Sequence, residues 1–347
     1  MKIINRKQKE NRSGSFSIKK LMKVLVIILL ALALFFYRDT LKEIMEGIRQ
    51  VTWVELGIGI FLSFLGYSLE GAAISVMAGA AASRLKTREG VFIAFVCEFY
   101  RLTTLGNGSG IAEIHYLHKK KIEPGSAAVL TVVQYMVKRA AIMFFGIAGF
   151  FFLLRREDTR ELCRKYAVFM GAGCLITLVV IAFLMGVALW PKATDAALWV
   201  VKWLSDKIPS QKANLEKGKE QILLLGNAGK SILRHRKKIL GVFCLQIGKL
   251  TAFYLIPAVV LNGKTELTGM ECVLVMAIAF MLAGVIPAPS GAGALEFVFL
   301  LFFTFFANPG GAVPAILLFR FATWVCPAIC GGALLLIQEI SGKKKKR

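Results

Sequence analysis

The sequence predicts an all-α polytopic membrane protein with about six full spans and two glycine-broken re-entrant hairpins, or eight spans, arranged as an inverted repeat. Three observations carry this prediction. The 347 residues are 56% hydrophobic, with a mean hydropathy of +0.64, whereas soluble domains are about 45 to 50% apolar. Long apolar stretches recur along the chain, and one glycine-containing motif occurs twice.

Six uninterrupted apolar stretches reach or approach the length of about 20 residues that an α-helix needs to cross roughly 30 Å of hydrocarbon. They cover residues 21–37, 53–80, 125–154, 166–190, 239–261 and 312–338. The first stretch follows a basic N-terminal segment, but no small-residue cleavage site comes after it. We therefore interpret it as a retained helix and not as a secretory signal.

Two further apolar regions, 91–117 and 270–306, are interrupted by residues that break helices. These are Gly108 and Gly110 in the first region and Pro287, Pro289, Gly291 and Gly293 in the second. Backbone groups freed at membrane depth are tolerated only where protein or a water-filled cavity covers them. We therefore expect re-entrant hairpins that line a cavity, and two thin spans per region would give the same topology.

The net charge of +23 is concentrated in three segments. Residues 1–20, the linker 191–238 and the tail 339–347 are basic, and they separate a first membrane half, 21–190, from a second, 239–338. Lys and Arg accumulate on the cytoplasmic side of membrane proteins, so we place these three segments, and with them both termini, in the cytoplasm. The loop around 155–165 is also basic, although this topology places it outside. Because membrane orientation explains the charge, we expect no direct contact with nucleic acid.

The repeated motif is Gly-x-Gly-x-x-Glu, which occurs at 108–113 and again 183 residues later at 291–296. Each copy is followed by an arginine within an apolar stretch, Arg139 after 26 residues and Arg320 after 24. In the predicted topology the first broken segment enters the membrane from inside and the second from outside. Inverted repeats with broken helices near the midplane are typical of secondary transporters.

Eight ionisable side chains fall inside the apolar regions. They are the carboxylates Glu70, Glu98, Glu113 and Glu296 and the bases Lys138, Arg139, Lys249 and Arg320. A charge at the centre of a membrane helix costs about 2.5 to 3.5 kcal/mol on insertion scales, so such residues either form static ion pairs or line a polar pathway. The recurrence of the arginines favours a pathway for the set.

Arginine binds phosphate through a planar, bidentate fork that lysine lacks. We therefore expect the four bases to bind a phosphate-bearing headgroup. The four acids would be pathway carboxylates, with Glu113 and Glu296 pairing with the arginines when the site is empty. Other chemistry is not indicated: His115 and His118 lie beside a lysine run, the seven cysteines lack disulfide spacing, and no glycine-rich loop follows a strand. We predict no catalytic residue, metal or cofactor.

The second broken segment also resembles a known family. The run 283–296 (AGVIPAPSGAGALE) and the following 318–327 (LFRFATWVCP) are similar to the flippase-like membrane domain of lysylphosphatidylglycerol synthase, the multiple peptide resistance factor. The glycines near residue 108 and the segment 116–122 resemble its first conserved region, without the proline often found before those glycines. The resemblance covers residues 21–338.

This resemblance implies movement of aminoacylated phosphatidylglycerol between leaflets of the plasma membrane and a link to cationic-peptide resistance. Two-part members add a cytosolic domain that transfers lysine from charged tRNA. Because this chain stops at Arg347, we expect the translocating half alone, with membrane lipids and a separate soluble transferase as partners. The alternatives are a phosphatidylglycerol lysyltransferase or its membrane subunit, and a scaffold for a cell-envelope glycosyltransferase. The sequence does not indicate which lipid, energy source or oligomeric state applies.

Overall fold

The chain is represented by a computed structural model that describes residues 51–344, except for 82, 105, 107, 156, 190–194, 196–197, 200, 204–233, 285, 287–292 and 308. Several predicted features lie outside the described residues: the N-terminal segment 1–20, the first span 21–37, most of the linker 191–238, and the helix breakers Pro287, Pro289 and Gly291.

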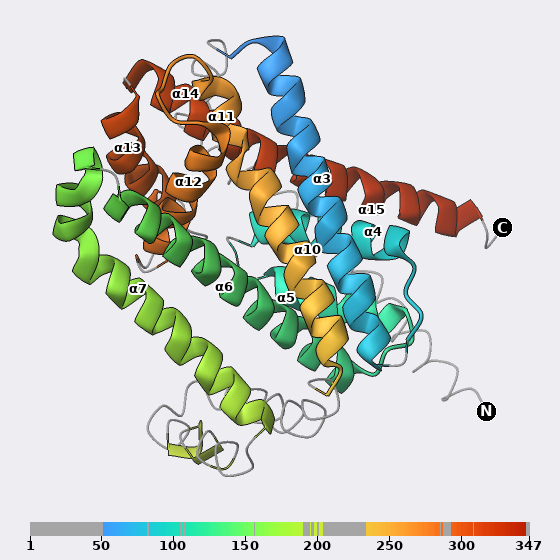
Figure 1. Cartoon of the computed structure of the whole chain (residues 1–347). Helices are drawn as coiled ribbons and strands as arrows, with labels where there is room; N and C mark the ends of the chain where they lie inside the picture. Colours follow the sequence, from blue (N-terminus) through green and yellow to red (C-terminus); the bar gives the residue numbers. More distant parts are fainter. Residues whose placement is uncertain are drawn as a thin grey trace, which may run out of the picture. The chain divides into compact units, whose positions relative to one another are not determined.

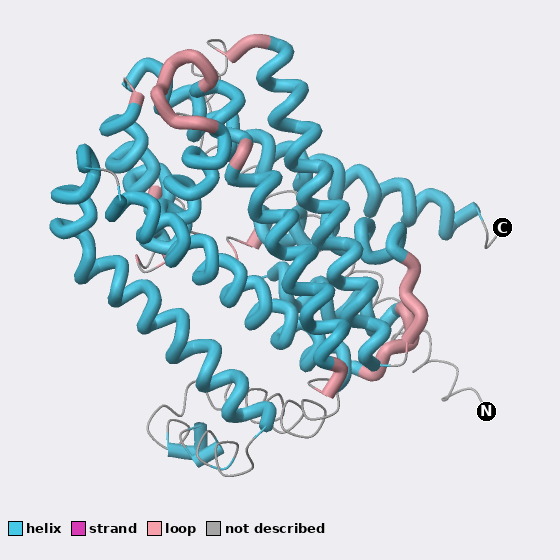
Figure 2. Tube along the Cα trace, in the orientation of Figure 1, coloured by secondary structure: helices cyan, strands magenta, loops and turns pink. Residues whose placement is uncertain are grey.

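The described residues are almost entirely helical and are joined by short loops (Figure 2). The first half contains α3 (Trp53–Ala78), the 3-10 turn η1 (Gly79–Ala81), α4 (Thr87–Thr103), α5 (Gly108–Lys119), α6 (Pro124–Arg155) and α7 (Glu157–Leu189). The second half contains α10 (Arg236–Tyr254), α11 (Ile256–Leu261), α12 (Gly269–Ala283), α13 (Ala294–Phe306), α14 (Pro309–Arg320), the π-helical turn η4 (Phe321–Val325) and α15 (Cys326–Lys344) (Figure 1).

Within the described residues, five helical segments are long and apolar enough to cross a membrane. They are Trp53–Ala81, Pro124–Arg155, Tyr166–Gly186, Arg236–Leu261 and Gly311–Ser341. Each coincides with one of the predicted spans. The prediction of an all-α, multi-pass membrane protein is confirmed, because the composition that excluded a soluble domain is arranged here as long apolar helices.

Capping residues in the sequence determine where helices α3 and α12 begin. Thr52 caps α3, since its hydroxyl accepts a hydrogen bond from the Glu55 backbone N–H while the Glu55 carboxylate accepts one from the Thr52 backbone N–H at 2.7 Å. Thr268 and Glu271 form the same reciprocal arrangement at the start of α12. A capping box satisfies two backbone donors that the first helical turn otherwise leaves free.

Both glycine-broken regions form helical hairpins, and the lengths of their arms favour the re-entrant alternative. Their arms, α4 with α5 and α12 with α13, contain 17, 12, 15 and 13 residues, which at 1.5 Å per residue is less than the roughly 30 Å of hydrocarbon. Each hairpin closes at its base. Glu89 at the start of α4 bonds Lys120 after the end of α5 at 2.6 Å, and Thr265, which precedes α12, donates to the Phe306 carbonyl at 3.0 Å.

The 183-residue spacing of the motif extends to whole helices. Adding it to the bounds of α3 gives 236–261, the range of α10 and α11, and α4 and α5 likewise map close to α12 and α13. Helix α6 maps onto α14, η4 and α15. The packing is reciprocal, because α4 of the first half packs on α15 of the second while α12 of the second packs on α6 of the first.

The equivalent helices α3 and α10 lie side by side and run in opposite directions (Figure 1). Gly66 of α3 meets Phe253 of α10, and towards the other end Lys238 donates to the carbonyl of Gly79. Residue numbers therefore rise along α3 as they fall along α10. Opposite directions of repeat-related helices are what an inverted repeat requires.

Glycine permits the two reciprocal helix contacts. A Cβ atom at Gly331 of α15 would collide with the backbone carbonyl of Phe95 on α4, and one at Gly149 of α6 would collide with the carbonyl of Leu274 on α12. Small residues let membrane helices approach to backbone contact. A glycine therefore allows close helix packing at similar places in the two halves.

We expect the bond between Glu89 and Lys120 to contribute little stability, because both side chains are partly exposed. The hydrogen bond from Lys120, with a second from the Lys86 backbone N–H, lowers the pKa of Glu89 below the ordinary glutamate value. A carboxylate with a depressed folded-state pKa stabilises the fold above its unfolded pKa, and this contribution disappears as the pH falls through the folded value. Lys120→Ala should cost at most about 1 kcal/mol at neutral pH. Thermal unfolding in detergent at pH 7 and below pH 4 should show a difference between variant and wild type only at pH 7.

Candidate functional site

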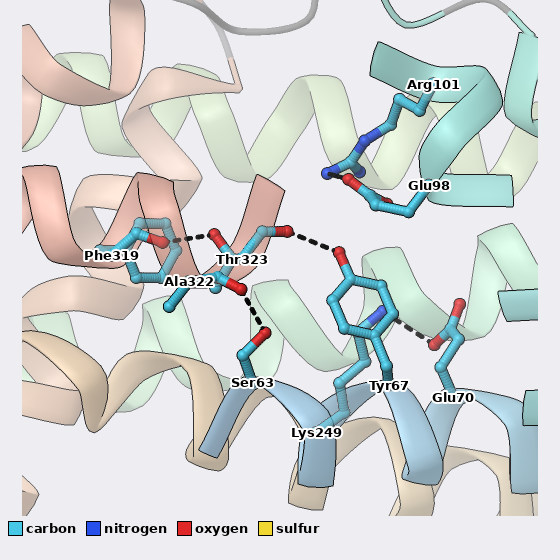
Figure 3. Close-up of polar contacts among 9 residues, drawn as sticks. All are labelled: Ser63, Tyr67, Glu70, Glu98, Arg101, Lys249, Phe319, Ala322 and Thr323. Carbon is cyan, nitrogen blue, oxygen red and sulfur yellow. Dashed lines mark hydrogen bonds and ion pairs between the residues drawn. The ribbon is translucent and has the colours of Figure 1, made fainter. Parts of the chain in front are cut away.

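Polar side chains inside the helical bundle form two neighbouring groups. We call the first the arginine cluster (Glu98, Arg101, Glu296, Arg320 and Trp324) and the second the lysine cluster (Glu70, Glu113, Lys138, Gln246 and Lys249). Tyr67 of α3 lies between the Glu70–Lys249 pair and the η4 turn (Figure 3). The two groups are built from both halves of the repeat.

Arg320, the last residue of α14, is held by a bidentate ion pair. Its Nε donates to Glu296 Oε1 at 2.6 Å and its second guanidinium nitrogen donates to Oε2 at 2.7 Å. Glu296 lies in the first turn of α13, directly after Gly293, whose φ of 80° reverses the chain into the helix. Only 7% of Arg320 is exposed. The ion pair connects the arm of the second hairpin to the helix that follows it.

A second arginine, Arg101 of α4, lies against the same aromatic ring. The guanidinium carbon of Arg320 is 4.1 Å from the Trp324 ring centroid, and that of Arg101 is 5.7 Å away. Glu98 bonds Arg101 at 2.6 Å (Figure 3). Each guanidinium therefore has a carboxylate partner and shares one tryptophan, which favours cations through its ring face.

The η4 turn immediately after Arg320 redirects this part of the helix. A π-helical turn carries a longer hydrogen-bond spacing than an α-helix and occurs frequently at functional sites. Ser63 donates to the Ala322 carbonyl at 2.5 Å, and the Tyr67 hydroxyl donates to the Thr323 carbonyl at 2.7 Å (Figure 3). Helix α3 thereby supplies side-chain donors to carbonyls of the turn.

In the lysine cluster, Glu70 of α3 is held by two residues of α10. Lys249 Nζ lies 2.9 Å from Glu70 Oε2 (Figure 3), and Gln246 donates to the same oxygen at 2.8 Å. The Lys249 ammonium also lies 5.6 Å from the centroid of the Tyr67 ring. Lys249, which we expect to bind a headgroup, lies here in an ion pair that joins α3 to α10, and its role in headgroup binding stays a prediction.

The remaining members of the lysine cluster are not paired with each other. Glu113 of α5 has a buried Oε1 atom without a hydrogen-bond partner among the described residues, and the same is true of the neighbouring Thr131 hydroxyl on α6. Lys138, two turns along α6, is among the charges nearest to Glu113, but no ion pair joins them in the described part of the chain. Glu113 and Lys138 both interact electrostatically with Glu70 and Lys249.

The expected pairing of Glu113 with Arg139 does not occur. Arg139 instead donates from Nε to the Tyr135 hydroxyl at 2.8 Å and lies beside Gly284, at the end of α12. Consecutive helical residues point about 100° apart, so Lys138 and Arg139 cannot both face α5. The equivalent pair Glu296–Arg320 does form, so the two repeats are chemically unequal at this position.

The glycines of the first break allow a tight approach between the two arms. Gly108 donates its backbone N–H to the Thr104 hydroxyl at 2.6 Å, and a Cβ on Gly108 would collide with that side chain. Gly110 faces Thr131 of α6, where a Cβ would be in ordinary van der Waals contact. Gly106 has a φ of 102°, which only glycine adopts readily.

The sequence did not single out Arg101, Trp324, Tyr67, Thr131 or Gln246 as parts of a site. Arg101 lies three residues after Glu98, and Trp324 lies four after Arg320. Residues three or four apart share a helix face, so these two could have been found from spacing. The other three act across helices and carry no such signal. Within the described residues, no three His, Cys, Asp or Glu side chains gather as metal ligands would.

A family model described as "Lysylphosphatidylglycerol synthase TM region" matches residues 21–331. The match includes both re-entrant hairpins, both arginines and the helices that carry them. No similar protein was found among the curated sequences searched.

Proposed function

Because this chain belongs to the lysylphosphatidylglycerol synthase TM region family, we propose that it translocates a phosphate-bearing phospholipid between the leaflets of the plasma membrane. The observation that carries the proposal is the arginine cluster. Two guanidinium groups lie against one tryptophan, and each is occupied by a carboxylate of the protein itself. Carboxylate and phosphate compete for the same bidentate geometry on arginine.

In this proposal Glu296 and Glu98 hold the arginines while no lipid is bound. An incoming phosphate takes their place on Arg320 and Arg101, and the released carboxylates remain nearby to restore the ion pairs when the lipid leaves. Arg320 is one of the headgroup residues expected from the sequence, and Arg101 replaces Arg139 as its neighbour. Exchange of one anion for another avoids leaving a buried guanidinium unpaired, which would cost several kcal/mol.

The inverted packing supports alternation of access. The two hairpins are equivalent, each packs on a helix of the opposite half, and each closes at its own base. A pair of equivalent halves can exchange conformations, so that a site between them faces first one leaflet and then the other. Family membership relates the chain to lysylphosphatidylglycerol synthesis, so an aminoacylated phosphatidylglycerol is the proposed cargo and a separate transferase the proposed source of it.

We predict that Arg320→Ala lowers the rate of lipid exchange by about 10- to 100-fold, the equivalent of losing a charge-assisted hydrogen-bonded contact of roughly 1.5 to 3 kcal/mol. Arg320→Lys should recover only part of this, because lysine keeps the charge but lacks the fork. The measurement is leaflet exchange of fluorescent phosphatidylglycerol and lysylphosphatidylglycerol in proteoliposomes. Arg155→Ala, at the exposed end of α6, is the matched control. Equal rates for wild type and Arg320→Ala would contradict the headgroup role.

A further inference from the structure

Glu113 differs from its repeat equivalent in having no basic partner. Glu296 accepts two hydrogen bonds from Arg320, whereas the Oε1 atom of Glu113 is buried and accepts none among the described residues. We propose that Glu113 is a proton-binding site and that its proton is moved together with the lipid. The inference rests on the proposed function, since it names the ion that would drive that transport.

An ionised carboxylate oxygen cannot remain buried without a partner at low cost. Pairing with a cation would offset this desolvation cost, but neither Lys138 nor Arg139 bonds to Glu113. Binding a proton removes the charge and converts one carboxylate oxygen into an O–H donor. The Thr131 hydroxyl, whose oxygen makes no other hydrogen bond within the described residues, lies beside the carboxylate, where it can accept from that O–H or donate to the ionised form.

The side chains that surround Glu113 favour the binding of a proton over the binding of a metal ion. The groups that face it from other helices are Glu70 of α3, Cys97 of α4, Lys138 of α6 and Lys249 of α10. The histidines of its own helix, His115 and His118, are near each other and Lys119 instead. Glu70 and Lys249 neutralise each other at 2.9 Å, which leaves one lysine and one glutamate. A metal ion needs several ligands, and within the described residues no three His, Cys, Asp or Glu side chains gather to supply them, whereas a proton needs only the carboxylate that it binds.

Lys138 provides the partner for the second state. In the conformation described here, Glu113 holds its proton and is separated from Lys138. A movement of the first hairpin along α6 would bring the two into contact, the proton would leave to water on the opposite side, and the resulting carboxylate would pair with the ammonium. Re-entry reverses these steps, with one proton bound and one released per cycle.

Because the two repeats differ, the first and the second hairpin would bind different ions. At the second hairpin the carboxylate is occupied by an arginine, and displacement of the carboxylate makes room for an anion. At the first hairpin the equivalent carboxylate is available to a cation. One site therefore responds to phosphate and the other to protons, and both are carried by arms that belong to equivalent hairpins.

Infrared spectroscopy of the purified full chain in lipid nanodiscs tests the protonation itself. At neutral pH we expect the C=O stretch of a protonated carboxylic acid, its loss in Glu113→Gln, and its retention in Glu123→Gln, which removes an exposed carboxylate. In Thr131→Val the band should shift in frequency, because the acceptor hydroxyl is gone. A wild type without this band, or a band that survives in Glu113→Gln, would overturn the inference. If Glu113→Gln does not fold, an unshifted band in Thr131→Val has the same consequence.

Transport in proteoliposomes tests the coupling. With an imposed pH gradient, wild type should accumulate labelled lysylphosphatidylglycerol in one leaflet at least severalfold over the gradient-free distribution, and Glu113→Gln should lose this response while Glu123→Gln keeps it. Exchange that ignores the pH gradient, or that follows a sodium gradient instead, overturns proton coupling and leaves the proposed function standing. An intact infrared band without any lipid exchange overturns the proposed function and leaves Glu113 as a proton site.

Discussion

Lys249→Ala is expected to destabilise the protein by about 3 to 5 kcal/mol, the cost typical of removing one member of a buried ion pair. Its ammonium is the cation that neutralises Glu70, and only 4% of Lys249 is exposed. Without it, Glu70 keeps the single hydrogen bond from Gln246, and of the two lysines whose charge acts on this carboxylate only Lys138, which makes no ion pair with it in the described residues, remains. The measurement is thermal and denaturant unfolding in detergent micelles.

The double variant Glu70→Met with Lys249→Leu should lose far less stability than Lys249→Ala alone, because replacing both charges by apolar groups removes the desolvation cost of each. The repeat itself supports this expectation. At the positions equivalent to Glu70 and Lys249, Phe253 packs against Gly66 without any charge. If the double variant is as unstable as the single one, the pair does more than neutralise charge between α3 and α10.

Gly331→Leu is expected to cost about 1 to 3 kcal/mol or more, since inserting side-chain atoms into a close-packed contact forces the helices apart. The Cβ alone would collide with the Phe95 carbonyl, which belongs to rigid backbone and cannot rotate away. Gly149→Leu should behave in the same way at the contact between α6 and α12. The readouts are the unfolding temperature and the yield of monodisperse protein.

Gly57→Leu is the matched control for these variants, because a Cβ at Gly57 of α3 meets no atom within 4 Å. It should leave stability unchanged or raise it slightly, as glycine is a poor helix former. If Gly57→Leu destabilised as much as Gly331→Leu, the loss would reflect glycine substitution in general and not the crossing of α15 and α4.

The sequence predicted the five spans that lie within the described residues, because a membrane helix is apolar over most of its length and hydropathy is a local property of the chain. It also predicted the two breaks, but it could not separate re-entrant hairpins from thin spans. The contacts that close the two hairpins, Glu89 with Lys120 and Thr265 with Phe306, were also beyond it. These residues lie 31 and 41 positions apart, and no periodic pattern relates them.

Site residues were predicted by type but not by partner. Charge within an apolar stretch identified Arg320 and Glu296, and the structure joins these two. The same rule suggested Arg139 for Glu113, and here the direction of each side chain around its helix determined otherwise. A linear motif repeats the residues of a site, but it does not specify the rotation of the helix that presents them.

The sequence by itself determined that this chain is a multi-pass helical membrane protein built from a repeated unit, because apolar length and motif spacing are written along the chain. Only the tertiary structure decided that the two units are unequal. Among the described residues, Glu296 meets an arginine, Glu113 bonds to no base, and Glu70 and Lys249 form a charged contact whose repeat equivalent is apolar. The physical reason is that the free energy of a buried charge depends on the few atoms around it, and those atoms come from helices far apart in sequence.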